Sequence, residues 1–447
     1  MSSYWKAHRP IGVVAIGALL LLWLFTGLIA LQRGPKGSSD FDTFYEAGKA
    51  VLHHTGTVYY EGEYYQQQKG VGPFLYPPIA ACFLAAFAFL PMPLAAFAWN
   101  TALLVLFLGA LFFTFKFLDL SREELPRVWN SVSLADRLLF AAVILIMLVD
   151  NLVMAQVGIL IFLLCAACLV LWKEGKNFRA GLILSTAVLL KLTPVFFCFY
   201  FLYKRAWKLT AGVVAGALML TLVVPTLIFG WEGNRIYHRQ WFGRMIKPML
   251  MDVLQRDKTS EGHPLNKSYE EMQNIRQTQL LVDTNQSLPA ALTRLFLKDR
   301  HLYQVTYRYE RLPVIGGGFS RGTMATMILS AEVILLLVLV FLFRASKGEM
   351  KVKIPLEVSL VFLSTVLLSP IARSHSFIVW VFVFAALFFV HAQAKSKQAV
   401  FIRFARGACV LYLLLALPYG EAVGMGAWAN LALWVGCAHS LAGRNLR

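Results

Sequence analysis

Two carboxylates, Asp40 and Asp42, lie close together in the stretch Ser38–Val51, directly after the first apolar run of the chain. Aromatic residues are interleaved with them, and an Ala-Gly pair follows. A carboxylate just outside a bilayer stays ionised, because water reaches it, and can act as a general base toward a hydroxyl group. We therefore expect Asp40 to be the catalytic centre. The alternative is a structural one, since aspartate before an apolar stretch is also a good helix N-cap.

Lys191 is the second candidate, because it interrupts the apolar segment Val188–Pro194. An ionisable residue inside a membrane segment is by default a candidate for function. As a compact positive charge it could hold a lipid phosphate. The alternative is a lysine that extends its ammonium group to the membrane surface.

Gln156 lies between two apolar runs, shortly after Asp150 and Asn151. Together these three side chains could line a polar surface. A plain loop at the membrane interface explains them equally well.

Amide and guanidinium groups follow in Asn285, Gln286 and Arg294, residue types that suit a sugar and a phosphate. The same residues could instead cap a helix that begins near Pro289.

Arg373 and His375 lie between two apolar segments and could contact a phosphate group of a donor. A single histidine is more often structural. His53 and His54 are adjacent, so their side chains point in different directions on a helix. We therefore expect no metal site and no cofactor.

The composition indicates a polytopic α-helical membrane protein. Hydrophobic residues make up 58% of the 447 residues, charged residues only 15%, and the mean hydropathy is +0.62. Apolar runs recur at about the 20 residues needed to cross a hydrocarbon core. The net charge of +18 lies largely in short loops, which indicates topology or contact with anionic membrane lipids. No nucleic-acid motif is present, so nucleic acid is not an expected partner.

The pattern predicts about twelve crossings, give or take one, in a single membrane domain over residues 1–447. Basic loops place the N-terminus in the cytoplasm and put Asp40 on the opposite side. Residues 32–75 form a first extracytoplasmic loop with a helix along the membrane surface, and residues 230–320 form a long one. The basic stretch Lys173–Arg179 requires residues 180–203 to be two short helices that are broken near Lys191–Pro194. Pro77 and Pro78 are expected to start a helix.

These motifs occur in a characteristic order. The chain carries Asp-Phe-x-x-Phe-x-x-Ala-Gly, Tyr-Pro-Pro, Gln-Val, Leu-Lys-Leu-Thr-Pro, Asn-Gln-Ser-Leu and Ser-Pro-x-x-x-x-His over residues 40–375. This ordered set resembles glycosyltransferase family 87, bacterial polyprenyl-phosphate-sugar-dependent transferases of the GT-C fold.

The resemblance implies a role for individual residues. Asp40 would be the general base, with Asp42 ranked second. The family's motif positions for substrate binding fall on Gln156, Lys191, Asn285, Gln286, Arg294 and His375. We add Asp42, Tyr45, Tyr76 and Arg373 to the expected binding residues. The chain departs from the family at Phe44, where tyrosine is frequent, and at Ala155, where glycine is frequent. Arg373 and Ser376 stand where the family commonly has tryptophan and a second histidine.

The resemblance implies an inverting transferase in a bacterial cytoplasmic membrane, with its active site on the extracytoplasmic face. It would move a sugar, most often mannose in such relatives, from a polyprenyl-phosphate donor to a lipid or glycan acceptor. One alternative is a lipid or solute transporter or a flippase, which predicts paired charges at mid-membrane and two related halves. Another is a ligase of lipid-linked glycans, which would tend to have a larger outer domain.

Overall fold

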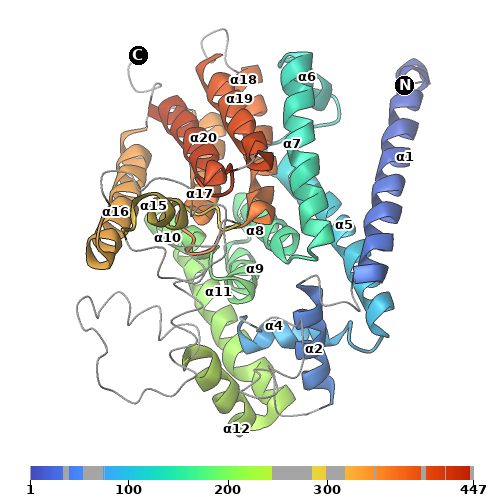
Figure 1. The fold of residues 1–447 in the computed structure, drawn as a ribbon. Coiled ribbons are helices and arrows are strands. Elements are labelled where there is room, and N and C mark those ends of the chain that lie inside the picture. Colours follow the sequence, from blue (N-terminus) through green and yellow to red (C-terminus); the bar gives the residue numbers. More distant parts are fainter. Residues whose placement is uncertain are drawn as a thin grey trace.

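The computed structural model describes residues 2–33, 40–53, 74, 76–243, 284–298, 318–346, 349–393, 399–417 and 419–442. Parts of the two predicted outer loops, among them residues 54–73 and 244–283, lie outside this set. The described residues form helices, apart from one isolated bridge between Leu297 and Phe319. The predicted all-α fold is therefore confirmed for the described part of the chain (Figure 1).

The elements follow one another in this order: α1 (Ser2–Arg33), α2 (Phe41–Leu52), α4 (Pro78–Ala85), α5 (Met92–Phe117), α6 (Glu124–Asn130), α7 (Leu134–Val153), α8 (Gly158–Lys173), α9 (Asn177–Leu190), α10 (Val195–Tyr203), α11 (Trp207–Leu218), the π-helix η2 (Met219–Val223), α12 (Val224–Trp241), α15 (Leu288–Phe296), α16 (Arg321–Ala345), α17 (Met350–Leu367), the 3-10 helix η7 (Ser374–Val379), α18 (Trp380–Gln393), α19 (Ala399–Leu413), the 3-10 helix η8 (Leu414–Ala416) and α20 (Met425–Ala442).

Four stretches in the described residues are long and apolar enough to cross a bilayer: Met92–Phe117, Trp207–Trp241, Gly322–Ala345 and Ser374–Gln393. The bent pair α6 and α7 could form a fifth. Other apolar helices, including α8 and α9, are shorter. A membrane protein follows from these helices, while the figure of about twelve crossings stays a prediction.

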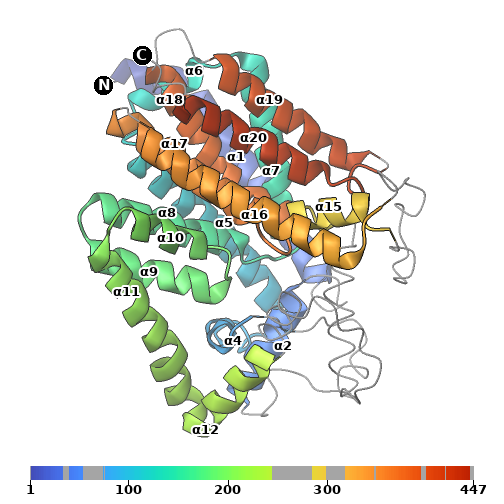
Figure 2. The same cartoon turned by 90° about the vertical axis from the view of Figure 1, so that its left-hand side faces the viewer.

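The bundle has a buried centre and an apolar exterior. In η7 and α18 together, 78% of the residues in the most apolar 18-residue stretch are buried, whereas in α16 only 17% are. Exposed leucines and phenylalanines on α16, such as Leu337 and Phe341, would destabilise a surface in water but suit a lipid environment. The centre therefore lies at α18, and α16 lies on the perimeter (Figure 2).

The predicted break between α9 and α10 is confirmed. Helix α9 ends at Leu190, Lys191 is extended, and α10 begins after Pro194. Proline cannot donate a helical hydrogen bond, and it disfavours helical geometry in the residue before it. The break therefore places Lys191 at the end of an apolar helix. Residues 191–194 connect α9 to α10 and belong to neither helix.

A smaller layer, formed by α2 and α4, packs below the bundle in the view of Figure 1. Pro77 and Pro78 start α4, as predicted. A Cβ atom on Gly48 of α2 would lie 2.8 Å from the Leu84 carbonyl group, so glycine permits the close packing of these helices. Helix α12 turns back toward α4 at Gly230, whose φ is 72° (Figure 2).

Helix α2 also confirms the predicted helix in the first outer loop. Its orientation relative to a membrane surface stays a prediction. Its buried residues Phe41, Phe44 and Val51 hold it against the rest of the protein. Because α2 begins at Phe41, this packing fixes the place of Asp40 directly before it.

Candidate active site

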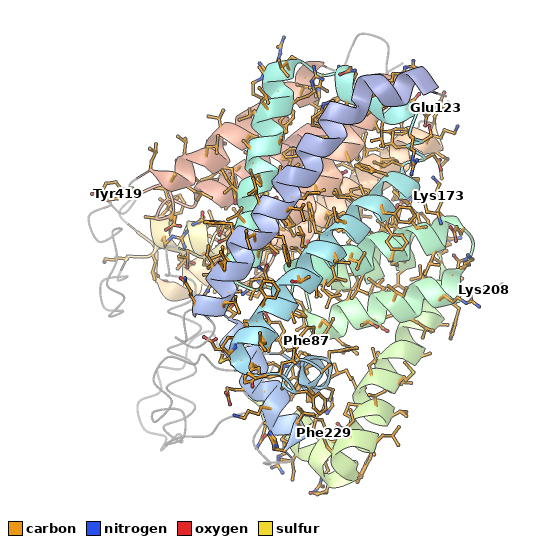
Figure 3. All side chains as sticks on the ribbon, turned by 90° about the vertical axis from the view of Figure 1, so that its right-hand side faces the viewer. Phe87, Glu123, Lys173, Lys208, Phe229 and Tyr419 are labelled. Carbon is orange, nitrogen blue, oxygen red and sulfur yellow. The ribbon has the colours of Figure 1, made fainter. Side chains whose placement is uncertain are left out.

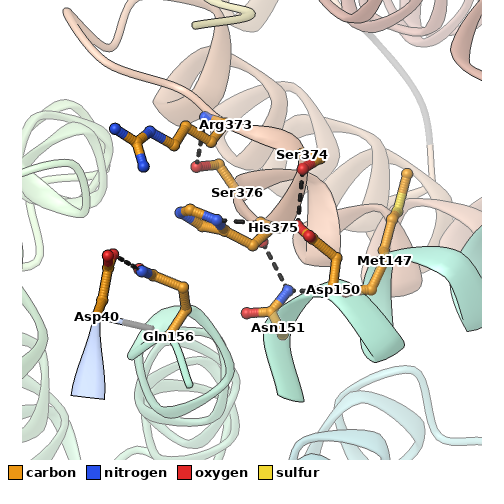
Figure 4. A network of polar contacts seen from close by, with 9 residues as sticks. All are labelled: Asp40, Met147, Asp150, Asn151, Gln156, Arg373, Ser374, His375 and Ser376. Atoms are coloured by element: carbon orange, nitrogen blue, oxygen red, sulfur yellow. Dashed lines mark hydrogen bonds and ion pairs between the residues drawn. The ribbon is translucent and has the colours of Figure 1, made fainter. Parts of the chain in front are cut away.

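Asp40 is the N-cap residue of α2, but its side chain makes no capping hydrogen bond. Its carboxylate instead accepts a hydrogen bond from Nε2 of Gln156, which lies 116 residues further along the chain (Figure 4). The capping interpretation therefore does not account for this carboxylate. The two buried rings of Phe41 and Phe44 anchor the helix that carries it.

Gln156 lies in the tight turn between α7 and α8 and is 2% exposed. Its backbone N–H donates to the Asn151 carbonyl over 3.0 Å. The preceding Ala155 has a left-handed φ of 54°, and its carbonyl accepts a 2.9 Å bond from the Trp99 indole. This conformation explains why glycine suits the position, and the turn aims Gln156 at Asp40.

His375 reaches the same place from the connection between α17 and α18. The end of α7 holds this segment, since Asn151 donates to the His375 carbonyl over 2.8 Å. Ser374 donates to the Asp150 carboxylate over 2.7 Å. His375 Nδ1 lies 3.9 Å from that same carboxylate. Asp150 and Asn151 thus position the histidine, whose ring points toward the side of Asp40 and Gln156 in Figure 4.

Tyr76, Lys191 and Arg373 belong to the same cluster, because electrostatic interactions connect them with one another or with Asp40. Burial raises the pKa of the Tyr76 phenol, the Asp40 carboxylate raises it further, and the Arg373 guanidinium lowers it. Burial lowers the pKa of Lys191, in the connection outside the helices, to about 8. Asp40 opposes that shift and Arg373 adds to it. Tyr76 and Lys191 therefore each lie within electrostatic range of both Asp40 and Arg373.

A cavity of about 40 Å³ adjoins the lysine. Its lining includes Lys191 and the hydroxyl-bearing residues Thr193, Ser369 and Ser376. It also includes Gly158, the first residue of α8, where helical N–H groups lack partners within the helix. These groups share the chemistry of anion binding: a cation, hydroxyl donors and a helix start.

Asn285 holds a stretch of backbone in place through three hydrogen bonds. Its Nδ2 donates to the Pro370 carbonyl over 3.0 Å, and its Oδ1 accepts from the Ala372 N–H over 3.0 Å and from the Ser287 N–H over 3.1 Å. The clamped residues directly precede Arg373. Asn285 therefore fixes the segment that carries Arg373 and His375.

Gln286 makes a second clamp, on the turn before α20. Its Nε2 donates to the Glu421 carbonyl over 2.9 Å, and its Oε1 accepts from the Gly426 N–H over 3.0 Å. Ser287 caps α15 by accepting from the Ala290 N–H over 3.3 Å. The predicted alternative, a helix cap in this motif, is confirmed for the serine.

Arg294 on α15 is fully buried and donates to three backbone carbonyls. Its Nε reaches Ala422 over 2.8 Å, Nη1 reaches Asn285 over 2.8 Å, and Nη2 reaches Glu421 over 3.1 Å. We call Asn285, Gln286 and Arg294 the α15 brace. The brace joins three segments, and α15 packs between α16 and α20 (Figure 2).

Two further predicted binding residues lie on α2. Asp42 is 1% exposed in the first turn of this helix. Tyr45 donates its hydroxyl group to the Leu90 carbonyl over 2.9 Å, which ties α2 to the turn before α5. Both are buried on α2, in the layer that α2 forms with α4.

The structure adds groups that the sequence did not single out. Trp99 and Ser374 hold the two segments that carry Gln156 and His375. The sequence around Trp99 or Ser374 does not indicate these roles, because each residue bonds to a partner far away in the chain. Asp150 and Asn151 could be found, since a carboxylate and an amide at the end of an apolar run stand out.

A sequence model of glycosyltransferase family 87 matches residues 74–370, well over half of the 447 residues. The match includes Tyr76, Gln156 and Lys191. It begins after Asp40 and ends before Arg373 and His375. The structure therefore brings together residues from inside and outside the matched range.

Curated relatives are mannosyltransferases of mycobacteria. A polyprenol-phosphate-mannose-dependent alpha-(1-2)-phosphatidylinositol mannoside mannosyltransferase of Mycolicibacterium smegmatis is 31% identical over 205 residues, which are 44% of this chain and 46% of that protein. Its namesake in Mycobacterium tuberculosis is 28% identical over 230 residues, 47% and 52% of the two chains. The match thus spans about half the length of these relatives.

Proposed function

The chain belongs to glycosyltransferase family 87, and we propose that it transfers mannose from a polyprenyl-phosphate donor to a hydroxyl group of a glycolipid. The names of the mycobacterial relatives support the sugar, the donor and the acceptor class. The reaction would take place at the cluster of Asp40, Gln156, Lys191, Arg373 and His375.

The donor would enter with its lipid tail in the bilayer. Lys191 and Arg373 supply two positive charges that act on each other, and Lys191 also interacts electrostatically with the Asp40 carboxylate. They would bind the phosphate diester, and the arginine fork could hold two of its oxygens. Their charge would also stabilise the phosphate monoester that forms when the sugar departs.

Asp40 would act as the general base. Its carboxylate takes the proton from the acceptor hydroxyl while the hydroxyl oxygen forms a bond to the anomeric carbon. The bond between that carbon and the phosphate oxygen breaks, and the electron pair leaves with the polyprenyl phosphate. Attack opposite to the leaving group inverts the anomeric centre. Gln156 would keep the carboxylate oriented through its hydrogen bond.

His375 would contact the substrates beside this carboxylate. Asn151 holds the histidine by donating to its carbonyl, and Asp150 holds the neighbouring Ser374 by accepting a hydrogen bond from its hydroxyl group. The two α7 residues are positioning residues in this scheme, and so is Asn285 through the segment before Arg373.

The proposal also places the cluster on the extracytoplasmic face. Basic turns at Lys173 and Lys208 lie on one side of the molecule in Figure 3, and Tyr419 lies on the opposite side. This separation agrees with the predicted placement of the basic loops inside and of the turn before α20 outside. Reporter fusions after Lys208 and within residues 54–73 test the placement directly.

One observation carries the proposal: the carboxylate at the start of α2 makes no capping hydrogen bond, accepts one from Gln156 and interacts electrostatically with Lys191. The test is an assay of the purified protein with radiolabelled polyprenyl-phosphate mannose and a bacterial lipid extract. We expect labelled glycolipid from the wild type and at least a hundredfold less from Asp40→Asn.

The matched control is Glu46→Gln, which removes a partly exposed carboxylate from the same helix. This variant should transfer the sugar at the wild-type rate. Movement of the intact donor across a vesicle membrane, without formation of glycolipid, would instead identify a flippase. Equal transfer by Asp40→Asn would remove Asp40 from the chemistry.

A further inference from the structure

An apolar groove of about 530 Å³ lies between α2, α4, α5 and α8. Aromatic and aliphatic side chains form its wall, among them Phe44, Phe87, Trp99 and Leu160. The indole N–H of Trp99 is bonded to the Ala155 carbonyl. The carbon atoms of the tryptophan therefore face the groove. The wall is apolar apart from Tyr76 and Thr101, and the Thr101 hydroxyl is already bonded to Trp23 and to the Phe97 carbonyl.

The outer rim of the groove faces the apolar exterior. Phe83 on α4 is 47% exposed and Val105 on α5 is 63% exposed, and both line the groove. Phe112 continues the exposed apolar face of α5, which is long enough to span a bilayer. The groove therefore opens to the hydrocarbon region, and Figure 3 marks its neighbourhood at Phe87.

The inner end of the groove adjoins the polar cluster. Val157 lines the groove directly after Gln156, and Leu190 lines it directly before Lys191. Tyr76 also lines the groove, and it interacts electrostatically with Asp40 and Arg373. The apolar wall thus ends at residues adjacent in the chain to Gln156 and Lys191, and at Tyr76.

We propose that this groove binds the first isoprene units of the donor's polyprenyl chain, with the donor phosphate at Lys191 and Arg373. This inference rests on the proposed function. The polyprenyl chain is attached directly to the phosphate, so its first isoprene units must lie next to the positive charges that bind the phosphate. The groove lies at that place. In a phosphatidylinositol mannoside, sugar rings separate the reacting hydroxyl from the acyl chains. The acceptor's apolar part would therefore begin farther from the cluster.

Filling the groove tests the proposal. Ala98 and Ala102 lie one helical turn apart on α5, both line the groove, and neither is fully buried. We would make Ala98→Phe and Ala102→Phe and measure KM and kcat with mannosyl phosphates of citronellol (short) and of heptaprenol (long). Ala325→Phe on the exposed face of α16 is the control.

The wild type should have a lower KM for the long donor than for the short one. Each groove variant should raise the KM for the long donor by about tenfold or more, while kcat and the KM for the acceptor change little. The control variant should match the wild type. A rise in the acceptor KM alone would assign the groove to acyl chains and overturn the proposal, and so would unchanged donor KM values in folded variants.

A second measurement needs neither transfer nor a variant. Heptaprenyl phosphate with a diazirine on its first isoprene unit is irradiated with the wild-type protein, and labelled peptides are sequenced. Labels on α4 and α5 that excess heptaprenyl phosphate removes support the groove, whether or not sugar transfer is found. Labels confined to the exposed faces of α11 and α16 contradict it. Groove labelling without transfer from either donor would refute only the proposed function.

Discussion

The cluster around Asp40 and the α15 brace contain similar polar residues but use them in opposite ways. In the brace, the guanidinium group of Arg294 donates to three backbone carbonyls and is fully buried. In the cluster, Arg373 and Lys191 are only half-buried, and the charges of Arg373 and Asp40 both act on the ammonium group of Lys191. Amides and guanidinium groups in a motif can thus hold the backbone as readily as they hold a substrate.

The two regions are connected. Asn285 clamps the backbone at Pro370 and Ala372, directly before Arg373. The brace therefore determines where the cluster's arginine and histidine lie. A substitution in either region can reduce activity, and only measurements that separate stability from binding distinguish their roles.

The largest expected effect is that of Arg294→Ala on stability. Loss of a buried guanidinium leaves three carbonyls without their donors, and we expect a loss of about 3–5 kcal/mol in the free energy of unfolding. Thermal unfolding in detergent measures it. Arg373→Ala is the matched control and should melt near the wild-type temperature. A stable Arg294→Ala protein with a raised donor KM would make Arg294 a substrate ligand.

The next effect concerns the donor. Lys191→Ala should raise the donor KM by about ten- to a hundredfold with little change in melting temperature, because a charged partner of the phosphate is lost. Lys208→Ala, on an exposed residue of α11, should leave both quantities unchanged. Steady-state kinetics with varied donor gives the result, and an unchanged donor KM would exclude Lys191 from phosphate binding.

The pH dependence sharpens this prediction. The pKa of Lys191 is lowered to about 8, so the free enzyme carries the ammonium group below about pH 8 and loses it above. Donor affinity should therefore fall as the pH rises through that value, by up to about tenfold per pH unit. Arginine stays protonated throughout, so Lys191→Arg should flatten the profile of donor KM against pH. Identical profiles would contradict the assignment.

The smallest effect is expected at Ala155, whose left-handed conformation costs an L-residue about 1–2 kcal/mol. Glycine removes this strain but gains freedom in the unfolded chain, worth about 0.5–1 kcal/mol. Ala155→Gly should thus stabilise the protein by about 1 kcal/mol or less and keep its activity. A clear drop in melting temperature would show that the turn needs the methyl group.

Local chemistry made parts of this fold predictable. Pro77 with Pro78 predicted the start of α4. The basic stretch Lys173–Arg179 required a break in residues 180–203, and the Lys191–Pro194 segment gave its place between α9 and α10. The helical spacing of Phe41, Phe44 and Val51 predicted α2. These features depend on residues within a few positions of one another, where proline geometry and helical periodicity act.

Other features depend on partners far along the chain. The sequence did not predict that Gln156 bonds Asp40 or that Arg294 bonds the carbonyls near Glu421. The sequence predicted that the long outer loop begins at Gly230, where the φ of 72° breaks the helix, but it did not predict the second helical stretch from there to Trp241. Hydropathy falls there, but a helix that packs on α4 can continue without an apolar sequence.

The central claim is that Asp40 performs the proton transfer and does not hold the donor. It is tested most directly by two measurements on Asp40→Asn: the donor Kd by direct binding, and the rate of sugar transfer in a single turnover with donor already bound. We expect a donor Kd near that of the wild type and a transfer rate lower by at least about a hundredfold. A wild-type transfer rate would contradict the claim, and so would a loss of donor binding that accounts for the whole effect.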